Sequence, residues 1–297
     1  MRKLLILMLV MFVMSGVANA DIATAYTAGG TGYVELNDNP SLAVIPQTWA
    51  ALDMIDVGQL PNGNTIAAYT SGSNQYLELY DSSMSAITNI NVNGLKAVSG
   101  LANGNVVAAY TSGSSDYVQI YDGTTLASGA WKAFSDVIDV TGMVTGAAGE
   151  IVIAYTSGST TYAEYYDLTM SVYASSWKSS SGIEHVAGME NGDVAMYYGA
   201  GTNYLQFFNG TGWTGGAWVS NNNIVDIAGL SGGDILLGYT SGSTDYLQAM
   251  DPTLSDFRTP WTSFSSITAI EGDYLVPEPA TLALLGLGSL MLRRRKK

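Results

Sequence analysis

Residues 67–81 read Ala-Ala-Tyr-Thr-Ser-Gly-Ser-Asn-Gln-Tyr-Leu-Glu-Leu-Tyr-Asp, and this phrase returns with changes five more times along the 297-residue chain. Each copy predicts a strand, a tight Gly-containing turn and a second strand that starts at Tyr and ends at Asp or Asn. The first tyrosines of the six copies are Tyr26, Tyr69, Tyr110, Tyr155, Tyr198 and Tyr239, at spacings of 43, 41, 45, 43 and 41 residues. Such a period indicates one supersecondary unit copied six times.

Two further strands flank the phrase in each repeat. The strand before it is marked by matching residue pairs, and turns such as Asn62-Gly63 join it to the phrase as a hairpin. The strand after it carries a tryptophan in five repeats, whereas the second repeat has Ile90 near that place. The pairs are Asp56-Val57, Ala97-Val98, Asp139-Val140, His185-Val186, Asp226-Ile227 and Ala269-Ile270, and the tryptophans are Trp49, Trp131, Trp177, Trp218 and Trp261. Each repeat is therefore predicted to form four antiparallel strands.

The repeats predict an all-β, six-bladed β-propeller over residues 21–275. Counted from residue 21, the chain opens on the second strand of a unit and ends, around residues 265–271, on a first strand. A C-terminal strand that completed the N-terminal blade would close the ring and leave no long edge unpaired. The alternative is a β-solenoid, although solenoid coils are commonly nearer about 20–30 residues. Short apolar helices are expected at both termini.

Composition and charge narrow the class of protein and partner. The chain has no cysteine, which excludes disulfides, thiolate metal sites and cysteine catalysis. Residues 21–275 keep only four of the 11 basic residues, against 24 acidic ones, so their formal charge is −20. Nucleic acid is therefore not an expected partner, and cations, neutral polysaccharide or basic proteins suit this surface better. The alternative is that the charge serves solubility alone.

Residues 1–20 have the three parts of an export signal. Arg2 and Lys3 precede an apolar run over residues 4–13, and Ala18-Asn19-Ala20 forms a small-residue cleavage site. Cleavage is predicted after Ala20, and the alternative is an uncleaved membrane anchor.

Residues 276–297 carry the clearest family resemblance in the chain. Pro277, Glu278 and Pro279 precede an apolar stretch, which ends in a basic cluster that includes Arg293, Arg294 and Arg295. This order resembles a PEP-CTERM sorting signal. The resemblance implies recognition and removal by exosortase, a membrane protease of Gram-negative bacteria that export such proteins alongside exopolysaccharide. Similar tails are also grouped under an ice-binding protein C-terminal domain.

The tail also has a direct physical interpretation. Residues 280–292 are apolar or small and would span about 20 Å as a helix, against a hydrocarbon core of about 30 Å. The basic cluster favours the cytoplasmic side, so translocation would pause with the propeller outside and inner-membrane contact through this transmembrane segment. We expect the mature protein at the cell surface or in the extracellular matrix, and the alternative is a permanent anchor.

The turn of the repeated phrase is one candidate binding surface. In a propeller the loops between second and third strands share one face of the ring, and here they would line it with hydroxyls beside aromatic rings, a combination that suits sugars. The candidate residues are Thr70, Ser71, Ser73, Thr111, Ser112, Ser114, Thr156, Ser157, Ser159, Thr240, Ser241 and Ser243. The alternative is plain turn chemistry, because tight hairpins favour Ser, Thr and Gly.

A second candidate site appears when the repeats are aligned. Asp56, Asp139 and Asp226 occupy matching places on the strand expected to be innermost, in alternate blades, so they are predicted to converge on the axis. Oxygen ligands of this kind favour Ca²⁺, although no cofactor is otherwise indicated. The alternative is that each Asp caps backbone N–H groups.

The remaining repeated residues are expected to be structural. The Asp that ends each Tyr-led strand, such as Asp81 or Asp122, fits a turn that bonds backbone N–H groups two residues on. The tryptophans are expected to wedge blades together. With one histidine, His185, and no cysteine, no nucleophile and base pair is evident.

Three functions follow from these observations. The first is a non-enzymatic surface or matrix protein whose propeller binds exopolysaccharide or surface proteins. The alternative is a propeller glycosidase or lyase acting on exopolysaccharide, since carboxylate pairs also serve that chemistry. Near-identical repeats favour the first, because a catalytic site must differ from its copies. An ice-binding protein is a distant third, because scattered threonines do not form a flat lattice.

Overall fold

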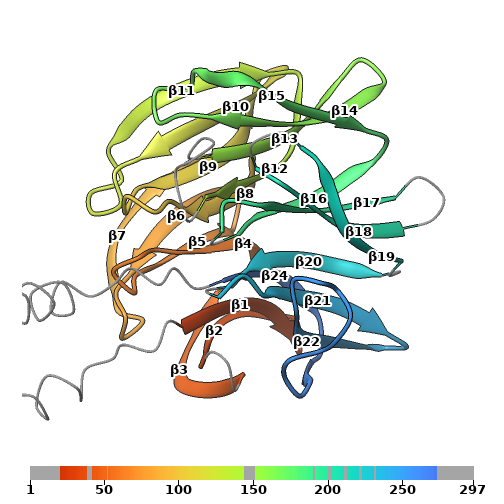
Figure 1. The fold of residues 1–297 in the computed structure, drawn as a ribbon. Helices are drawn as coiled ribbons and strands as arrows, with labels where there is room; N and C mark the ends of the chain where they lie inside the picture. The colour runs from red at the N-terminus through yellow and green to blue at the C-terminus, as the bar shows by residue number, and fades with distance from the viewer. Residues whose placement is uncertain are drawn as a thin grey trace, which may run out of the picture.

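The computed structural model describes residues 21–272 except for 39–41, 52, 144–150, 190, 200–202, 211–212, 221–222 and 231. In this part of the chain, 24 strands form six separate four-stranded antiparallel sheets (Figure 1). The sheets are called blades 1 to 6 in chain order. The described residues contain no helix that could cross a membrane. The prediction of six four-stranded antiparallel blades is confirmed, and the solenoid alternative is wrong.

Each blade takes its strands from one repeat, except that blade 1 also takes the last strand of the described chain. Blade 1 contains β24 (Ile267–Glu271), β1 (Asp21–Ala28), β2 (Thr31–Asp38) and β3 (Ala43–Ala51). Blade 2 contains β4 (Asp53–Gln59), β5 (Thr65–Ser71), β6 (Asn74–Tyr80) and β7 (Ala86–Asn91). Blade 3 contains β8 (Leu95–Gly100), β9 (Val106–Ser112), β10 (Ser115–Tyr121) and β11 (Ser128–Phe134).

The second half repeats this order. Blade 4 contains β12 (Asp136–Gly142), β13 (Ile151–Ser157), β14 (Thr160–Tyr166) and β15 (Val172–Ser180). Blade 5 contains β16 (Ile183–Gly188), β17 (Val194–Gly199), β18 (Asn203–Phe208) and β19 (Gly215–Ser220). Blade 6 contains β20 (Ile224–Gly229), β21 (Ile235–Ser241), β22 (Thr244–Met250) and β23 (Thr262–Phe264).

The two ends of the described chain meet in blade 1. Strand β24 pairs antiparallel with β1, with Ala25 opposite Ala269 and Thr24 opposite Ile270. β24 also contacts β20 and β4, the innermost strands of the two neighbouring blades. The innermost strands β4, β8, β12, β16, β20 and β24 thus contact one another in succession around the centre.

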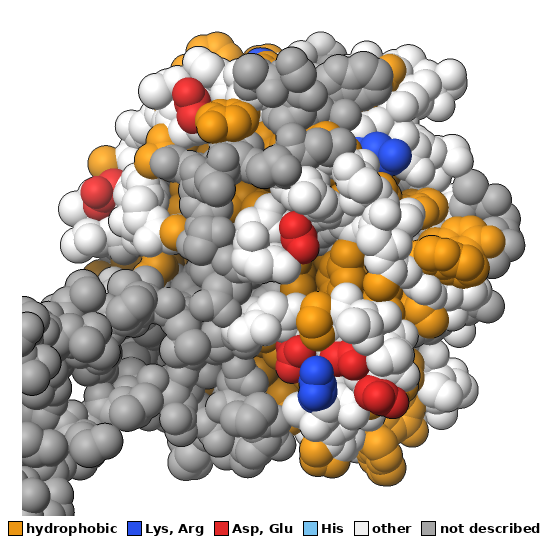
Figure 2. All heavy atoms as spheres, in the orientation of Figure 1, with side chains coloured by type: hydrophobic (Ala, Val, Ile, Leu, Met, Phe, Trp, Pro, Cys, Tyr) orange, Lys and Arg blue, Asp and Glu red, His pale blue; other side chains and the backbone are white. Residues whose placement is uncertain are grey.

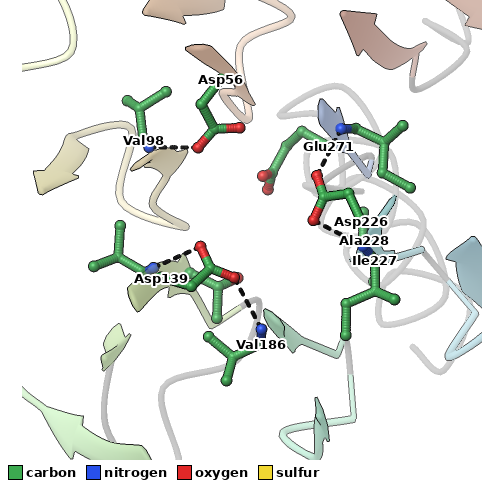
Figure 3. Close-up of a pocket in the computed structure, with 12 residues that line it drawn as sticks. Asp56, Val98, Asp139, Val186, Asp226, Ile227, Ala228 and Glu271 are labelled. Carbon is green, nitrogen blue, oxygen red and sulfur yellow. Dashed lines mark hydrogen bonds between the residues drawn. The ribbon is translucent and has the colours of Figure 1, made fainter. Parts of the chain in front are cut away.

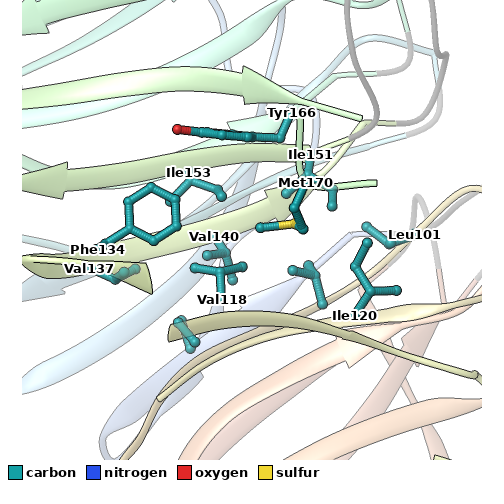
Figure 4. Close-up of a cluster of buried hydrophobic side chains, with 13 residues drawn as sticks. Leu101, Val118, Ile120, Phe134, Val137, Val140, Ile151, Ile153, Tyr166 and Met170 are labelled. Carbon is teal, nitrogen blue, oxygen red and sulfur yellow. The ribbon is translucent and has the colours of Figure 1, made fainter. Parts of the chain in front are cut away.

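The hydrophobic core lies between blades rather than within one. Six clusters of buried residues each join two neighbouring blades, including one cluster that joins blade 6 to blade 1. Between blades 3 and 4, Val118 and Ile120 of β10 pack against Ile151 and Ile153 of β13 (Figure 4). Because alternate side chains of a strand point to opposite faces, one strand places side chains in the clusters on both sides of its blade. This arrangement fixes each inner strand beside its neighbour.

In blade 2, the polar residue in the middle of the Tyr-led strand is buried. Glu78 is 8% exposed. It accepts hydrogen bonds of 2.6 Å from both Tyr69 and Tyr80. In blade 3, Gln119 accepts from Tyr110 and Tyr121 in the same way. The alternation in the sequence therefore marks a buried acceptor between two tyrosine hydroxyls.

In blades 2, 3, 4 and 6, the turn after the Tyr-led strand confirms the structural role expected for its Asp. Asp81 Oδ1 accepts from the backbone N–H groups of Ser83 and Ser85, both at 2.9 Å. In all six blades this turn also holds a large residue with positive φ, a conformation that costs about 1–3 kcal/mol outside glycine. These residues are Leu42, Met84, Leu126, Met170, Trp213 and Leu254, with φ from 51° to 60°, and all six are buried. Burial of the apolar side chain offsets the strained backbone.

The two predicted processing segments lie outside the described residues. This applies to the export signal, to residues 273–297 with their Pro-Glu-Pro and basic cluster, and to the short apolar helices expected at both termini.

Candidate functional site

The centre of the ring gathers the three aspartates that the repeat alignment predicted to converge. Asp56, Asp139 and Asp226 come from β4, β12 and β20, and all three line one small cavity of ≈ 20 Å³ (Figure 3). In each inner strand the pairing register shifts just before the aspartate, as between Met54 and Asp56. Such β-bulges turn the following side chain away from its regular direction. The same shift occurs before Ala97 and His185.

Each axial carboxylate joins two neighbouring blades. Asp56 accepts from Val57 N of its own strand at 2.8 Å and from Val98 N of the next blade at 2.6 Å. The other two repeat this pattern: Asp139 bonds Val140 N and Val186 N, and Asp226 bonds Ile227 N and Ile270 N, all at 2.8–2.9 Å. Both oxygens of every carboxylate are thus engaged by backbone donors. The alternative that these aspartates cap backbone groups is confirmed, and their binding of a cation stays a prediction.

His185 stands between two of these carboxylates. Its Nδ1 lies 3.3 Å from Asp226 Oδ1 and 3.9 Å from Asp139 Oδ2. The candidate ligand atoms of these three residues lie within 4.8 Å of one another, and Asp56 is not part of that group. A histidine therefore takes the place at the cluster where the sequence analysis expected a third carboxylate.

The protonation of the cluster follows from burial and from these neighbours. Burial raises the pKa of Asp56 well above its usual range, and the charges of Asp226 and Asp139 raise it further. Burial also raises the pKa of Asp139, which reaches about 6 although the His185 charge acts in the opposite direction. For His185, burial alone would lower the pKa, but the hydrogen bond that it donates to Asp226 and the charges of Asp226 and Asp139 raise the pKa to about 9. At neutral pH an imidazolium therefore bridges two blades.

Some of the predicted loop residues are exposed to solvent, whereas others form hydrogen bonds within the protein. The turns are two-residue hairpins, in which a Gly such as Gly72, at φ 64°, precedes an exposed Ser. Two of the threonines are engaged inward: Thr111 donates to Asp116 and Thr240 to Asp245, both at 2.7 Å. The serines on the exposed side of the described turns are Ser73, Ser112, Ser114, Ser157, Ser159, Ser241 and Ser243. Ligand binding by these loops stays a prediction.

Sequence reasoning missed the residue that joins the loop edge of one blade to the next. It directly precedes the second tyrosine of the phrase and accepts from the first backbone N–H groups of the following inner strand. The contacts are Gln75 to Leu95 N at 2.7 Å, Asp116 to Val137 N at 2.7 Å, Thr161 to Ile183 N at 3.2 Å and Asp245 to Ile267 N at 2.7 Å. The signal was a polar residue at one fixed repeat position, but its chemistry varies between blades.

The tryptophans do not wedge blades together where the structure describes their side chains. Trp131, Trp218 and Trp261 are 59%, 60% and 61% exposed. These tryptophans lie on or beside the outermost strand of their blade, at the edge of the sheet. The prediction that they wedge neighbouring blades together is therefore wrong for these three. Each one contacts the second tyrosine of its own phrase instead.

The comparisons with known proteins separate the tail from the ring. Residues 275–297 match the PEP-CTERM protein-sorting motif. This PEP-CTERM tail contains the Pro277, Glu278 and Arg293 positions singled out in the sequence. A search among curated proteins finds no significant match.

Solved structures resemble the ring alone. A protein of unknown function from Bacteroides caccae has TM-score 0.61 at 11% identity, covering 86% of this chain and 98% of its own. TolB from Acinetobacter baumannii has TM-score 0.64 at 13% identity, covering 86% and 67%. The periplasmic gluconolactonase PpgL from Pseudomonas aeruginosa has TM-score 0.53 at 10% identity, covering 84% and 98%. At such identities the likeness shows the propeller fold and no activity.

Proposed function

We propose that this chain is an exported, non-enzymatic propeller protein that exosortase delivers to the surface or matrix of a Gram-negative cell, where it binds exopolysaccharide or surface proteins. The observation that carries the proposal is the PEP-CTERM tail at residues 275–297. In this proposal the sorting motif determines where the protein is delivered, and the six-bladed propeller supplies a broad surface for binding. In this proposal β24 keeps the ring closed in solution, and the apolar part of the tail contacts the inner membrane before cleavage.

The repeated architecture supports binding rather than turnover. The same acceptor for the hydroxyl of the first tyrosine recurs in blades 2, 3 and 6, so these blades share one local arrangement. The face drawn in Figure 2 is mostly uncharged, with scattered Asp and Glu and few Lys or Arg. A surface of this kind suits a neutral polymer better than an anionic one.

Sorting is tested by mass. The chain is expressed in matched hosts with and without exosortase, and the surface fraction is analysed by intact-mass spectrometry. We expect a product without residues 1–20 and without the basic cluster in the first host, and a retained tail in the second. A Glu278→Ala variant should behave as in the second host. A tail retained equally in both hosts would contradict the sorting part of the proposal.

The second candidate function, a glycosidase or lyase, is favoured by one observation. The axial group joins His185 to two carboxylates, and the pKa values of His185 and Asp139 are shifted, as is common at functional sites. A degradation assay on the host's exopolysaccharide separates the two functions. Product released in many turnovers per protein, and lost in Asp139→Asn, would favour the enzyme over the scaffold.

A further inference from the structure

Among the side chains that the structure describes, three blades carry the same column of aromatic rings, which we call the aromatic triplets. Each triplet contains the first and second tyrosines of the phrase and the outer tryptophan. The triplets are Tyr110–Tyr117–Trp131, Tyr198–Tyr204–Trp218 and Tyr239–Tyr246–Trp261. Strand pairing sets the register, since the two tyrosines of each phrase lie directly opposite each other. The column therefore runs from the second strand of a blade to its outer edge.

The tyrosines orient each indole without burying it. Trp131 lies 5.6 Å from the Tyr117 ring at 59°, and Trp218 and Trp261 lie 5.3 Å from their tyrosines at 74° and 84°. Each tryptophan nevertheless exposes about three-fifths of its surface, whereas Trp213, in a turn, is 7% exposed. A single exposed aromatic residue is ordinary, but three that each contact the second tyrosine of their own phrase form a repeated surface. An orientation fixed in advance lowers the ordering cost of binding.

The charge of the ring selects the class of ligand. All four basic side chains of residues 21–275 already have partners within the molecule. Lys96 pairs with Asp116 and Asp136, Lys132 lies over Tyr166, Lys178 lies over Phe208, and Arg258 lies within 4.0 Å of Asp234 and Asp251. No basic side chain of this region is left to pair with an anionic polymer, and the surplus of acidic residues would repel one. The ligand that fits exposed aromatic rings on such a surface is uncharged.

We propose that the three aromatic triplets are equivalent platforms on which the apolar faces of sugar rings in one neutral polysaccharide stack. This rests on the proposed surface-binding function and names its ligand class and residues. A second copy of the chain is a poorer occupant, because one isologous contact patch cannot cover platforms on blades 3, 5 and 6 together. A polymer meets several platforms at once, so weak single contacts add up through effective concentration.

Blade 2 provides an internal control. Its outer strand has Asn89 opposite Glu78, in the register where Trp131 lies opposite Gln119 and Trp218 opposite Gln206. The backbone thus accepts Asn at this place. Replacement of the tryptophans by Asn, and the reverse change Asn89→Trp, remove or add a platform without altering the strand. Phe257, 49% exposed and outside the triplets, supplies a matched aromatic control.

The test is affinity electrophoresis of the full exported chain in gels containing dextran, laminarin, starch or hydroxyethylcellulose, with anionic alginate as the charge control. We expect retardation by at least one neutral glucan and not by alginate. Each single Trp→Asn change should weaken the affinity for the retarding glucan about 2- to 10-fold, as expected for one lost aromatic contact. The triple variant should lose at least tenfold, Asn89→Trp should gain, and Phe257→Asn should match the wild type.

The outcomes separate the inference from the function. A triple variant with unchanged circular dichroism, unchanged melting and unchanged retardation would overturn the platforms while leaving polysaccharide binding in place. Absence of retardation by every neutral glucan, or retardation by alginate alone, would overturn the platforms as well, while the mass analysis of the tail still decides sorting. A wild-type dimer that the triple variant converts to monomer in sedimentation would assign the tryptophans to self-association and also overturn the inference.

Discussion

At the scale of residues, His185 is set apart by the two carboxylates that face it from neighbouring blades. Asp226 lies on β20 and Asp139 on β12, while His185 lies between them on β16. The matching residues in blades 3 and 1 are Ala97 and Ala269, so the inner strand itself does not need histidine. The charge on His185 therefore contributes a bridge that other blade junctions lack.

This bridge predicts that stability falls as the pH rises. The folded-state pKa of His185, about 9, exceeds its ordinary value of 6.5, so its contribution is complete below pH 6.5 and is lost as the pH passes 9. Asp139, raised to about 6, acts in the same direction between pH 4 and 6. In thermal unfolding, His185→Ala should flatten the decline between pH 6.5 and 9.5, on the order of 2 kcal/mol. Identical pH profiles for the two proteins would contradict the bridge.

A second residue-scale prediction concerns the buried acceptor Glu78. Glu78→Ala leaves the hydroxyls of Tyr69 and Tyr80 without their shared acceptor, and Tyr80 is only 1% exposed. The expected loss is about 1–3 kcal/mol in urea unfolding. Glu78→Gln should stay within about 0.5 kcal/mol of the wild type, because Gln119 fills the same role in blade 3. An equal loss in both variants would contradict this assignment.

At the scale of elements, backbone contact between inner strands limits which residues the blade junctions accept. A Cβ on Gly229 would lie 2.0 Å from the carbonyl oxygen of Gly188, and one on Gly188 would lie 2.2 Å from that of Gly142. Neighbouring inner strands thus approach so closely near their ends that any side chain there would collide. This close approach explains why Gly188 and Gly229 are glycines although neither has the positive φ of a turn glycine.

The junction predicts opposite outcomes for two Gly→Ala changes. Gly229→Ala meets rigid backbone and should destabilise by about 1–3 kcal/mol or more. Gly216→Ala, on outer strand β19, places its Cβ 3.6 Å from the nearest atom and should change stability by about 0.5 kcal/mol or less. Thermal unfolding of the two variants under one buffer condition measures the contrast. Equal melting temperatures would show that the inner strands separate without cost.

Sequence periodicity predicted the elements better than the contacts between them. Four strands per blade followed from one repeated phrase, because alternation and turn residues are local properties. The β-bulges, the interblade acceptor at Asp116 and the exposure of Trp131 depend on which blade lies beside which. The convergence of the three axial aspartates could be predicted because equivalent positions of the repeats lie at the same distance from the axis of the propeller. The alignment placed His185 at the matching position of the repeat between Asp139 and Asp226, but its contacts with these residues, 46 and 41 residues away, could not be read from the sequence.

At the scale of the whole molecule, the ring depends on its last described strand. Ile267 and Ile270 of β24 are 4% and 2% exposed and belong to the cluster between blades 6 and 1. Asp226 and Asp245 of blade 6 also bond the backbone N–H groups of these two isoleucines. Strand β24 therefore combines core packing with both kinds of interblade hydrogen bond.

Removal of this strand should open the ring. A chain that ends at Phe264 loses two buried isoleucines, a cost of about 3–6 kcal/mol, and uncovers the edge of β1. We expect a lower melting temperature, increased dye binding and protease cleavage near residue 21. A chain that ends at Gly272 keeps β24 and should unfold like the full protein. Indistinguishable melting of the two truncations would refute a closed ring in solution.

The pairing of β1 with β24 also determines the order in which the blades can be completed during synthesis. Of the described strands, the one made first waits for the one made last, about 240 residues later, so blades 2 to 6 can assemble while β1 still lacks a partner on one side. During that interval β1 is open to pairing with another nascent copy. Slow synthesis of the final repeat, or a stop codon within it, would thus favour pairing of the open β1 edge between molecules rather than a merely shorter protein.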